Sequence, residues 1–346
     1  MSGEEAKGEK GKMTGETEVP GSKLLDDIIL ASYKGAIFQA ALELRVWEKI
    51  GAGQRTSKDI AQNEGWDPVG TRMLLDLLCN FGLLRKDKVG YHLVPIAELY
   101  LLPSKPSYMG ETLLSDLRWE DNGGLAEAIR TGKRPLNTQR TEEELARIWA
   151  GWFTPRRVSP YRDIEKIDAY WESLKIEVHE GMRVLDVACG SGIKTLAFAR
   201  NHPILITLQD WPAVLEVALE MANKLGVRNR VTTIAGDVRS VSLGHNAFDL
   251  VWLGYIARFF GPNGIVELLS RVKEAMVPGG ILILNEPIRD ETSCQNEDTL
   301  IDAMWLFCVS KEGDVHTLSE FRGFLEQAGF VNVTEFGEEF FKATKP

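Results

Sequence analysis

Residues 184–192 constrain the fold of this chain more than any other stretch. They read Val-Leu-Asp-Val-Ala-Cys-Gly-Ser-Gly, and the apolar, β-branched first half is typical of a strand buried in a parallel sheet. Gly190 and Gly192 follow, and because glycine has no Cβ, backbone N–H groups can come close to a ligand there. A dinucleotide-binding turn would need a third small residue where this chain has Thr195. We therefore predict a strand followed by a ligand-binding glycine turn of another kind.

Four more apolar segments continue the arrangement. They lie at residues 204–208, 231–235, 248–253 and 279–287. Helical patterns separate them, which predicts an α/β fold with a doubly wound, Rossmann-like sheet. Acidic residues follow successive strands, Asp210 after the second and Asp237 after the third. Asp210 lies 18 residues past Gly192, where a carboxylate can accept both hydroxyls of a ribose.

The glycines and the acids at successive strand ends resemble the pattern of S-adenosylmethionine (SAM)-dependent methyltransferases. From about Leu25 to the end, the chain is similar to small-molecule O-methyltransferases with an N-terminal winged-helix dimerisation domain. The resemblance implies SAM as cofactor, S-adenosylhomocysteine as product and no metal. It assigns the methionyl part to the glycines and Asp186, the ribose to Asp210 and the adenine to Asp237 with Val238. The expected cofactor set is Asp186, Gly190, Gly192, Asp210, Trp211, Asp237 and Val238.

Length and composition indicate two domains. A chain of 346 residues with 44% hydrophobic residues can bury two cores. Residues 1–23 have almost no large apolar side chains, so we predict a disordered tail there. A winged-helix dimerisation domain is expected at residues 24–105, a helical connector lining the substrate pocket at 106–178, and the SAM-binding methyltransferase domain at 179–346.

Charge and cysteine usage exclude several partners. A formal net charge of −10 argues against binding to nucleic acid or an anionic membrane. The four cysteines have neither metal-ligand nor redox spacing. No apolar run approaches the roughly 20 residues of a membrane span, and no signal-peptide core is present. We therefore expect a cytoplasmic protein.

The N-terminal pattern is helical and then winged. Apolar residues recur at helical spacing over residues 28–44 and 68–81, and residues 83–93 read as a β-hairpin. A winged helix would also suit a ligand-sensing DNA-binding regulator. However, the third helix has Arg72 as its only cation, beside Asp67 and Asp76. A homodimer interface fits its dense apolar face better.

Two segments are candidates for the substrate pocket. Residues 141–175 are mostly helical and rich in aromatics, which pack in an interdomain core or, as the resemblance implies, roof the pocket. Residues 302–308 resemble a second wall. The candidate substrate residues are Trp149, Trp152, Phe153, Arg156, Tyr161, Arg258, Met304, Trp305 and Cys308. Three arginines of the roof, at positions 156, 157 and 162, form either an anion site or a solvated helix face.

The chain departs from the family it resembles at the catalytic base. The family places a histidine shortly after the fourth strand, and Arg258 stands at that position here. Arginine stays protonated, so it cannot remove a proton from an acceptor. The remaining catalytic candidates are Tyr255, Glu286 and His316, of which His316 reads most simply as an exposed loop residue. Tyr255 or Glu286 could orient a substrate or relay a proton.

These observations leave several functions open. We expect methyl transfer to a small, carboxylate-bearing acceptor whose sulfur, carbon, nitrogen or ionised oxygen needs no histidine base. Arg258 then pairs with the substrate carboxylate or forms a structural ion pair. The alternatives are a conventional O-methyltransferase with a relocated base, an enzyme that uses SAM without transferring its methyl group, and the winged-helix regulator.

Overall fold

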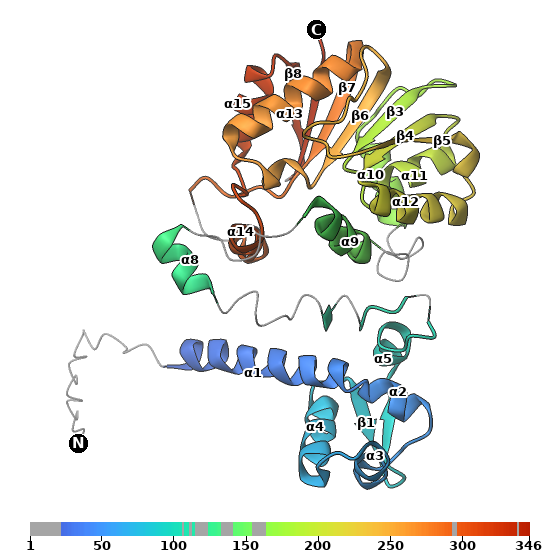
Figure 1. Ribbon diagram of the computed structural model, residues 1–346, viewed down its shortest axis with the longest axis vertical. Helices are drawn as coiled ribbons and strands as arrows, with labels where there is room; N and C mark the ends of the chain where they lie inside the picture. The colour runs from blue at the N-terminus through green and yellow to red at the C-terminus, as the bar shows by residue number, and fades with distance from the viewer. Residues whose placement is uncertain are drawn as a thin grey trace, which may run out of the picture.

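The computed structural model describes residues 22–105, 107–110, 113–114, 124–132, 141–153, 164–292, 296–337 and 339–346. A helical N-terminal part and an α/β C-terminal part are joined by a connector that contains α8, Leu125–Thr131, and α9, Glu142–Trp152 (Figure 1). Most of the predicted tail lies outside the described residues. Lys23, which was assigned to that tail, is the first residue of α1. No described helix is long and apolar enough to cross a membrane.

The N-terminal part has the expected helices and hairpin wing. Its elements are α1 Lys23–Glu43, α2 Val46–Gly51, α3 Ser57–Glu64, α4 Pro68–Asn80, β1 Leu84–Lys86, β2 Tyr91–Leu93 and α5 Pro95–Tyr100. Thr56 caps α3, and Asp67 caps α4 ahead of a proline in the first turn. Trp47, Leu75 and Leu78 are buried at the centre of this small core.

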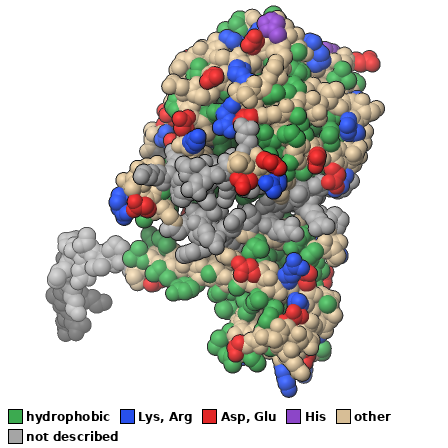
Figure 2. All heavy atoms as spheres, viewed as in Figure 1, with side chains coloured by type: hydrophobic (Ala, Val, Ile, Leu, Met, Phe, Trp, Pro, Cys, Tyr) green, Lys and Arg blue, Asp and Glu red, His purple; other side chains and the backbone are tan. Residues whose placement is uncertain are grey.

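The outer face of α1 is apolar and uncovered in the single chain. Leu24, Leu25, Ile28, Ile29 and Tyr33 are all more than half exposed, and Figure 2 shows hydrophobic side chains gathered along this helix. An exposed apolar face of this extent indicates an interaction surface.

The C-terminal part is built on one seven-stranded sheet in the order β5-β4-β3-β6-β7-β9-β8. Its strands are β3 Arg183–Val187, β4 Leu205–Asp210, β5 Val231–Ala235, β6 Phe248–Gly254, β7 Met276–Asn285, β8 Val331–Phe336 and β9 Phe340–Thr344. The first five are parallel, and these are the five predicted strands. The antiparallel hairpin β8–β9, which the sequence patterns did not reveal, extends the sheet beyond β7.

Helices cover both faces of this sheet (Figure 1). One core lies under α10 Ile164–Ser173, α11 Ile193–Asn201 and α12 Pro212–Lys224. The other lies under α13 Pro262–Ala275 and α15 Leu318–Gln327. The predicted Rossmann-like fold is therefore confirmed, and the chain order reverses at β3, which lies between β4 and β6. Ligands of such sheets bind outside the carboxyl ends of the strands at the reversal point.

Candidate active site

The glycine turn after β3 has an unusual backbone that glycine makes possible. Ala188, Gly190 and Gly192 have φ angles of 51°, 56° and 66°, in the left-handed region. A Cβ on Gly190 would lie 2.9 Å from the ring of Phe153. A larger residue at position 190 would therefore be strained and would push the roof away from the turn.

Asp210 holds this turn in place from the end of β4. Its Oδ2 accepts a hydrogen bond from the Gly190 N–H at 2.9 Å, and its Oδ1 accepts one from Trp211 N–H at 2.7 Å. Burial raises the pKa of Asp210 to about 6, although these N–H groups act in the opposite direction. Gln209, which the sequence reasoning missed, links Ala188 N–H to the carbonyl of Gly236 through its amide.

The other expected cofactor residues lie at the same edge with different surroundings. Asp186 is buried beneath the turn, where Thr195 Oγ1 donates to it at 2.5 Å, and burial raises its pKa to about 7. The carboxylate of Asp237 pairs with Arg239 at 2.8 Å. Val238 packs its side chain into the core, so only its backbone is placed to meet a ligand.

Trp211 and the turn together suit a nucleoside with a positively charged amino-acid tail. The indole Nε1 of Trp211 is buried and has no hydrogen-bond partner among the described residues. The left-handed turn leaves no Cβ at Gly190 and Gly192, and Asp186, Asp210 and Asp237 supply carboxylates along one edge. We conclude that the residues present fit SAM.

Aromatic side chains from three distant segments meet above this edge. Trp149 of α9 lies edge-on to Phe259, with ring centroids 5.3 Å apart, and Trp152 lies 6.1 Å from Trp305. Phe259 belongs to a short 3-10 helix, Ala257–Phe259, and Trp305 to α14, Glu297–Val309. The roof and the second wall expected from the sequence are therefore in contact.

Not every predicted substrate residue can be placed. Arg156 and Tyr161, like Arg157 and Arg162, lie outside the described residues. Met304 is 43% exposed, whereas Cys308 is buried. The prediction for Cys308 as a wall residue gains nothing from the structure, because its side chain packs in the interior.

Arg258 forms an ion pair within the chain. Its guanidinium Nη1 donates to the Asp302 carboxylate of α14, and both side chains are partly buried. The guanidinium carbon lies 5.0 Å from the Tyr255 ring centroid and 5.6 Å from that of Phe259. Arg258 therefore forms the structural ion pair that was one of its two expected roles. Its Nε is buried and has no hydrogen-bond partner among the described residues, so this edge of the guanidinium can still bind a ligand.

Glu286 is a fully buried carboxyl close to Arg258. Its Oε1 accepts from the Ala257 N–H at 2.7 Å, whereas Oε2 has no partner among the described residues. Burial raises the pKa of Glu286 to about 7, against the opposing effect of the Arg258 cation. Tyr255 has a left-handed backbone with φ of 59°, and its hydroxyl donates to Glu339 Oε2 at 3.2 Å.

His316 is not the exposed loop residue that the sequence suggested. It is only 4% exposed, and its ring lies edge-on to Phe321 and Phe324. Burial lowers its pKa, while Glu320, whose Oε2 lies 3.7 Å from its Nδ1, acts in the opposite direction. The interpretation was wrong because the short β-bridge to Ile288 draws this loop into the fold.

Lys194 is a further residue that the sequence reasoning missed. It stands in the first turn of α11, yet its Nζ reaches Asn285, the last residue of β7, at 2.5 Å. In the sequence, Lys194 is noticeable only as the residue before Thr195, the position where a dinucleotide-binding turn would have a small residue. Its position two residues after a glycine turn, in the mostly apolar segment 193–199, was the available signal.

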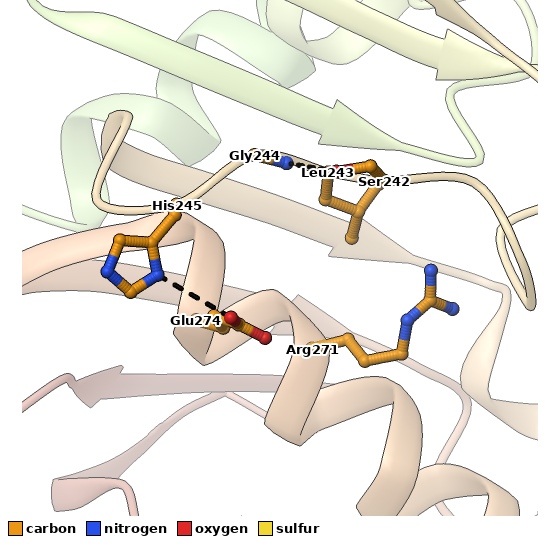
Figure 3. A pocket seen from close by; sticks show the side chains of 6 residues that line it. All are labelled: Ser242, Leu243, Gly244, His245, Arg271 and Glu274. Atoms are coloured by element: carbon orange, nitrogen blue, oxygen red, sulfur yellow. Dashed lines mark hydrogen bonds and ion pairs between the residues drawn. The ribbon is translucent and has the colours of Figure 1, made fainter.

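A shallow pocket lies elsewhere, beside the start of β6 and the end of α13 (Figure 3). It is lined by Ser242, Leu243, Gly244, His245, Arg271 and Glu274. The start of β6 is the sheet edge opposite Asp186 and Asp210, so this pocket is separate from the candidate site. Within the described residues, no cluster of three or more His, Cys, Asp or Glu could hold a metal ion.

Comparison with known families shows which family the chain belongs to. A family model for an O-methyltransferase domain matches residues 172–331, and one for an O-methyltransferase dimerisation domain matches residues 27–103. The chain belongs to the O-methyltransferase family. It is a SAM-dependent methyltransferase, and the resemblance noted in its sequence is confirmed.

Individual relatives agree with this assignment. The chain is 26% identical to 3-hydroxy-5-methyl-1-naphthoate 3-O-methyltransferase of Streptomyces sahachiroi, over 88% of each chain. It is 25% identical to the tetracenomycin 8-O-methyltransferase TcmO of Streptomyces glaucescens, over 93% of this chain and 95% of the relative. The solved structure of human N-acetylserotonin methyltransferase with SAM has the same fold, with a TM-score of 0.71 at 20% identity, covering 96% of this chain and 99% of that one.

The dimerisation domain predicts the solution state of this methyltransferase. The exposed apolar face of α1 belongs to the region that matches that domain. Obligate dimers bury large apolar areas, so we expect a particle of twice the 38.7 kDa chain mass. Light scattering at micromolar concentration measures it, and replacing Ile28 and Tyr33 by Asp should shift the mass toward one chain. A wild-type monomer would show that this face has another use.

Glu286 should make the ligand-free methyltransferase less stable as the pH rises. Its pKa is about 7 in the folded state against an ordinary 4.5, so the folded protein keeps a proton that the unfolded chain has lost. This contribution is complete below about pH 4.5 and is lost as the pH rises through about 7. At about pH 8, Glu286→Gln should raise the free energy of unfolding by up to roughly 2 to 3 kcal/mol. Denaturation curves at about pH 5 and pH 8 measure this, and a variant less stable than wild type at the higher pH would contradict it.

Proposed function

We propose that this methyltransferase acts on a small, flat aromatic acceptor that carries a carboxylate, and that no histidine base takes part in the transfer. The observation that carries the proposal is Arg258, a permanent cation in contact with the rings of Tyr255 and Phe259. The sequence resemblance places Arg258 where a catalytic histidine is expected in this family. The aromatic cluster of Trp149, Phe259 and Trp305 suits the faces of a planar molecule. The Streptomyces sahachiroi relative is named for a naphthoate, which is an aromatic carboxylate.

The ion pair with Asp302 is compatible with a second carboxylate on Arg258. A guanidinium has five N–H donors in a planar fork, and Asp302 contacts the Nη1 side. The Nε is free of described partners, so a carboxylate can pair in bidentate fashion with the edge that Nε and Nη2 share. Asp302 then holds the fork in orientation while the substrate binds the other edge.

In this mechanism the main task of the protein is to position the acceptor beside the methyl donor. Bound SAM supplies a methyl group activated by its sulfonium. The residues of the chain would hold the acceptor beside the bound cofactor, and the roof of Trp149 and Phe153 would exclude water from above the turn. An acceptor atom with an available lone pair, a sulfur, carbon, nitrogen or ionised oxygen, then needs no proton removed in the transition state.

A relocated base is the second candidate mechanism, and Glu286 is the observation in its favour. Its raised pKa of about 7 and its unpartnered Oε2 are properties of a general base. In that case Glu286→Gln abolishes transfer to phenols. In the base-free mechanism it leaves the maximal rate within a few-fold of wild type.

The deciding experiment follows S-adenosylhomocysteine formation with purified protein, SAM and a panel of hydroxy-, mercapto- and amino-naphthoates and -benzoates. Methylated product with the acids and little with their methyl esters supports the proposal. Equal rates with acids and esters would remove the carboxylate from it. If the acceptor is consumed in the presence of SAM but no S-adenosylhomocysteine forms, the protein is instead an enzyme that uses SAM without transferring its methyl group.

A further inference from the structure

Lys194 has an environment that surface lysines do not have. Its Nζ lies 5.2 Å from the ring centroid of Trp252 and 4.7 Å from that of Tyr255, and it donates to Asn285 at 2.5 Å. Asn285 is itself fully buried, and its Nδ2 donates to the carbonyl of Glu339 at 3.3 Å. The lysine head group is therefore fixed at the carboxyl ends of β6 and β7.

This position adjoins the proposed acceptor site. Lys194 follows the glycine turn by two residues, so it begins where the methionyl part of SAM is expected. The Tyr255 ring contacts both the Lys194 ammonium and the Arg258 guanidinium. Tyr255 is 38% exposed and has a left-handed backbone, a strained conformation that residues at functional sites often adopt. Two cations therefore lie within 5.0 Å of the centroid of one aromatic ring.

The ammonium also has hydrogen-bonding capacity in reserve. A lysine head group has three N–H donors, and among the described residues only Asn285 accepts one of them. The main charged groups around it are acids on three elements, namely Glu339 beside β9, Asp186 on β3 and Glu286 after β7. These acids favour the charged form, while burial disfavours it and lowers the lysine pKa to about 8. Near neutral pH the group is thus mostly a cation with unused donors.

We propose that Lys194 is a catalytic residue that binds the accepting oxygen of a phenolic acceptor and stabilises its ionised form. This inference rests on the proposed function, in which Arg258 binds the carboxylate of the same molecule. The phenol releases its proton to solvent as it binds, and its oxygen lone pair then forms the new bond to the methyl carbon. The electrons of the broken sulfur–carbon bond leave with the thioether product. No protein base accepts a proton in this step, because the cation has already ionised the oxygen.

A chromogenic phenol tests this without turnover. We would titrate 4-hydroxy-3-nitrobenzoate, whose phenolate absorbs visible light, in the presence of excess protein and S-adenosylhomocysteine. We expect its phenol pKa to fall by about one unit, which is a tenfold change in the ionisation constant. Lys194→Met, which keeps a chain of similar length against Trp252 and Tyr255, should lose this shift, and Lys194→Arg should keep most of it. Failure of wild type to bind or to shift the probe would overturn the proposal.

Matched controls separate this effect from others. Lys224→Met removes a lysine that pairs with Glu220 on the outside of α12, and it should leave the shift unchanged. The probe 2-nitrophenol has no carboxylate, so a shift that persists with it and disappears in Lys194→Met cannot come from Arg258. If Lys194→Met does not fold, as judged by its melting curve, Lys194→Gln serves in its place. A full shift in either folded variant would contradict the role of Lys194.

Turnover gives an independent test. With acceptors of rising phenol pKa, kcat of Lys194→Met should fall at least tenfold for weakly acidic phenols and much less for nitrophenols that are already ionised, with KM for SAM unchanged. An equal fall in kcat for all acceptors of the series would indicate a structural role for Lys194. If wild type shifts the probe but methylates no phenol, the proposed function fails while the oxyanion site stands. If it methylates the panel without shifting the probe, only the role of Lys194 fails.

Discussion

Arg258→Ala is expected to raise KM for a carboxylate-bearing acceptor about 100-fold and to leave the affinity for S-adenosylhomocysteine almost unchanged. The variant loses a charged hydrogen-bond pair worth on the order of 2 to 3 kcal/mol, and it loses it equally in the ground and transition states. Arg258→Lys should recover only part of the loss, because the ammonium lacks the planar fork. Steady-state kinetics with each acceptor measure these effects.

Two controls isolate the carboxylate contact. The methyl ester of the acceptor should show nearly the same KM with wild type and Arg258→Ala. Asp302→Asn keeps the shape of the Asp302 side chain while removing its charge, so a similar KM rise there would assign the effect to the orientation of Arg258. If Arg258→His turns over faster than wild type and acquires a pH limb near the histidine pKa of about 6.5, the base-free mechanism is wrong.

Asp210→Ala is expected to weaken SAM and S-adenosylhomocysteine binding by about ten- to a hundredfold. The loss of a charged acceptor for the ribose hydroxyls costs on the order of 1.5 to 3 kcal/mol. The structure adds a second reason, because the same carboxylate holds Gly190 N–H at 2.9 Å and so shapes the glycine turn. Calorimetry with S-adenosylhomocysteine measures the change.

Asp249→Ala is a matched control for this experiment. Asp249 pairs with Arg183 at 2.9 Å on the opposite edge of the same sheet. Its loss removes an ion pair of the same domain without touching the candidate site, so the dissociation constant should stay within a factor of two of wild type. An unchanged constant in Asp210→Ala, or an equal loss in both variants, would remove the ribose role from Asp210.

The five parallel strands and the glycine turn were predictable from sequence because their signals are local. A buried parallel strand is a short apolar run, and a left-handed turn needs glycine at specific positions such as 190 and 192. Carboxyl ends of parallel strands meet at one edge, so the sequence alone assigns Asp186, Asp210 and Asp237 to the same region. The hairpin β8–β9 was not predicted, because β8 is largely exposed and lacks that apolar signal.

The sequence by itself determined the five parallel strands, the glycine turn and the edge at which a nucleoside would lie. Only the tertiary structure decided what the ionisable side chains do there. The partners of Arg258 and Lys194 are Asp302 and Asn285, which lie 44 and 91 residues away in the chain. Likewise, the protonation state of Glu286 depends on its complete burial. Such pairings leave no periodic pattern in a sequence, and the pKa of a carboxyl or an ammonium depends on the water and charges that the folded chain places around it.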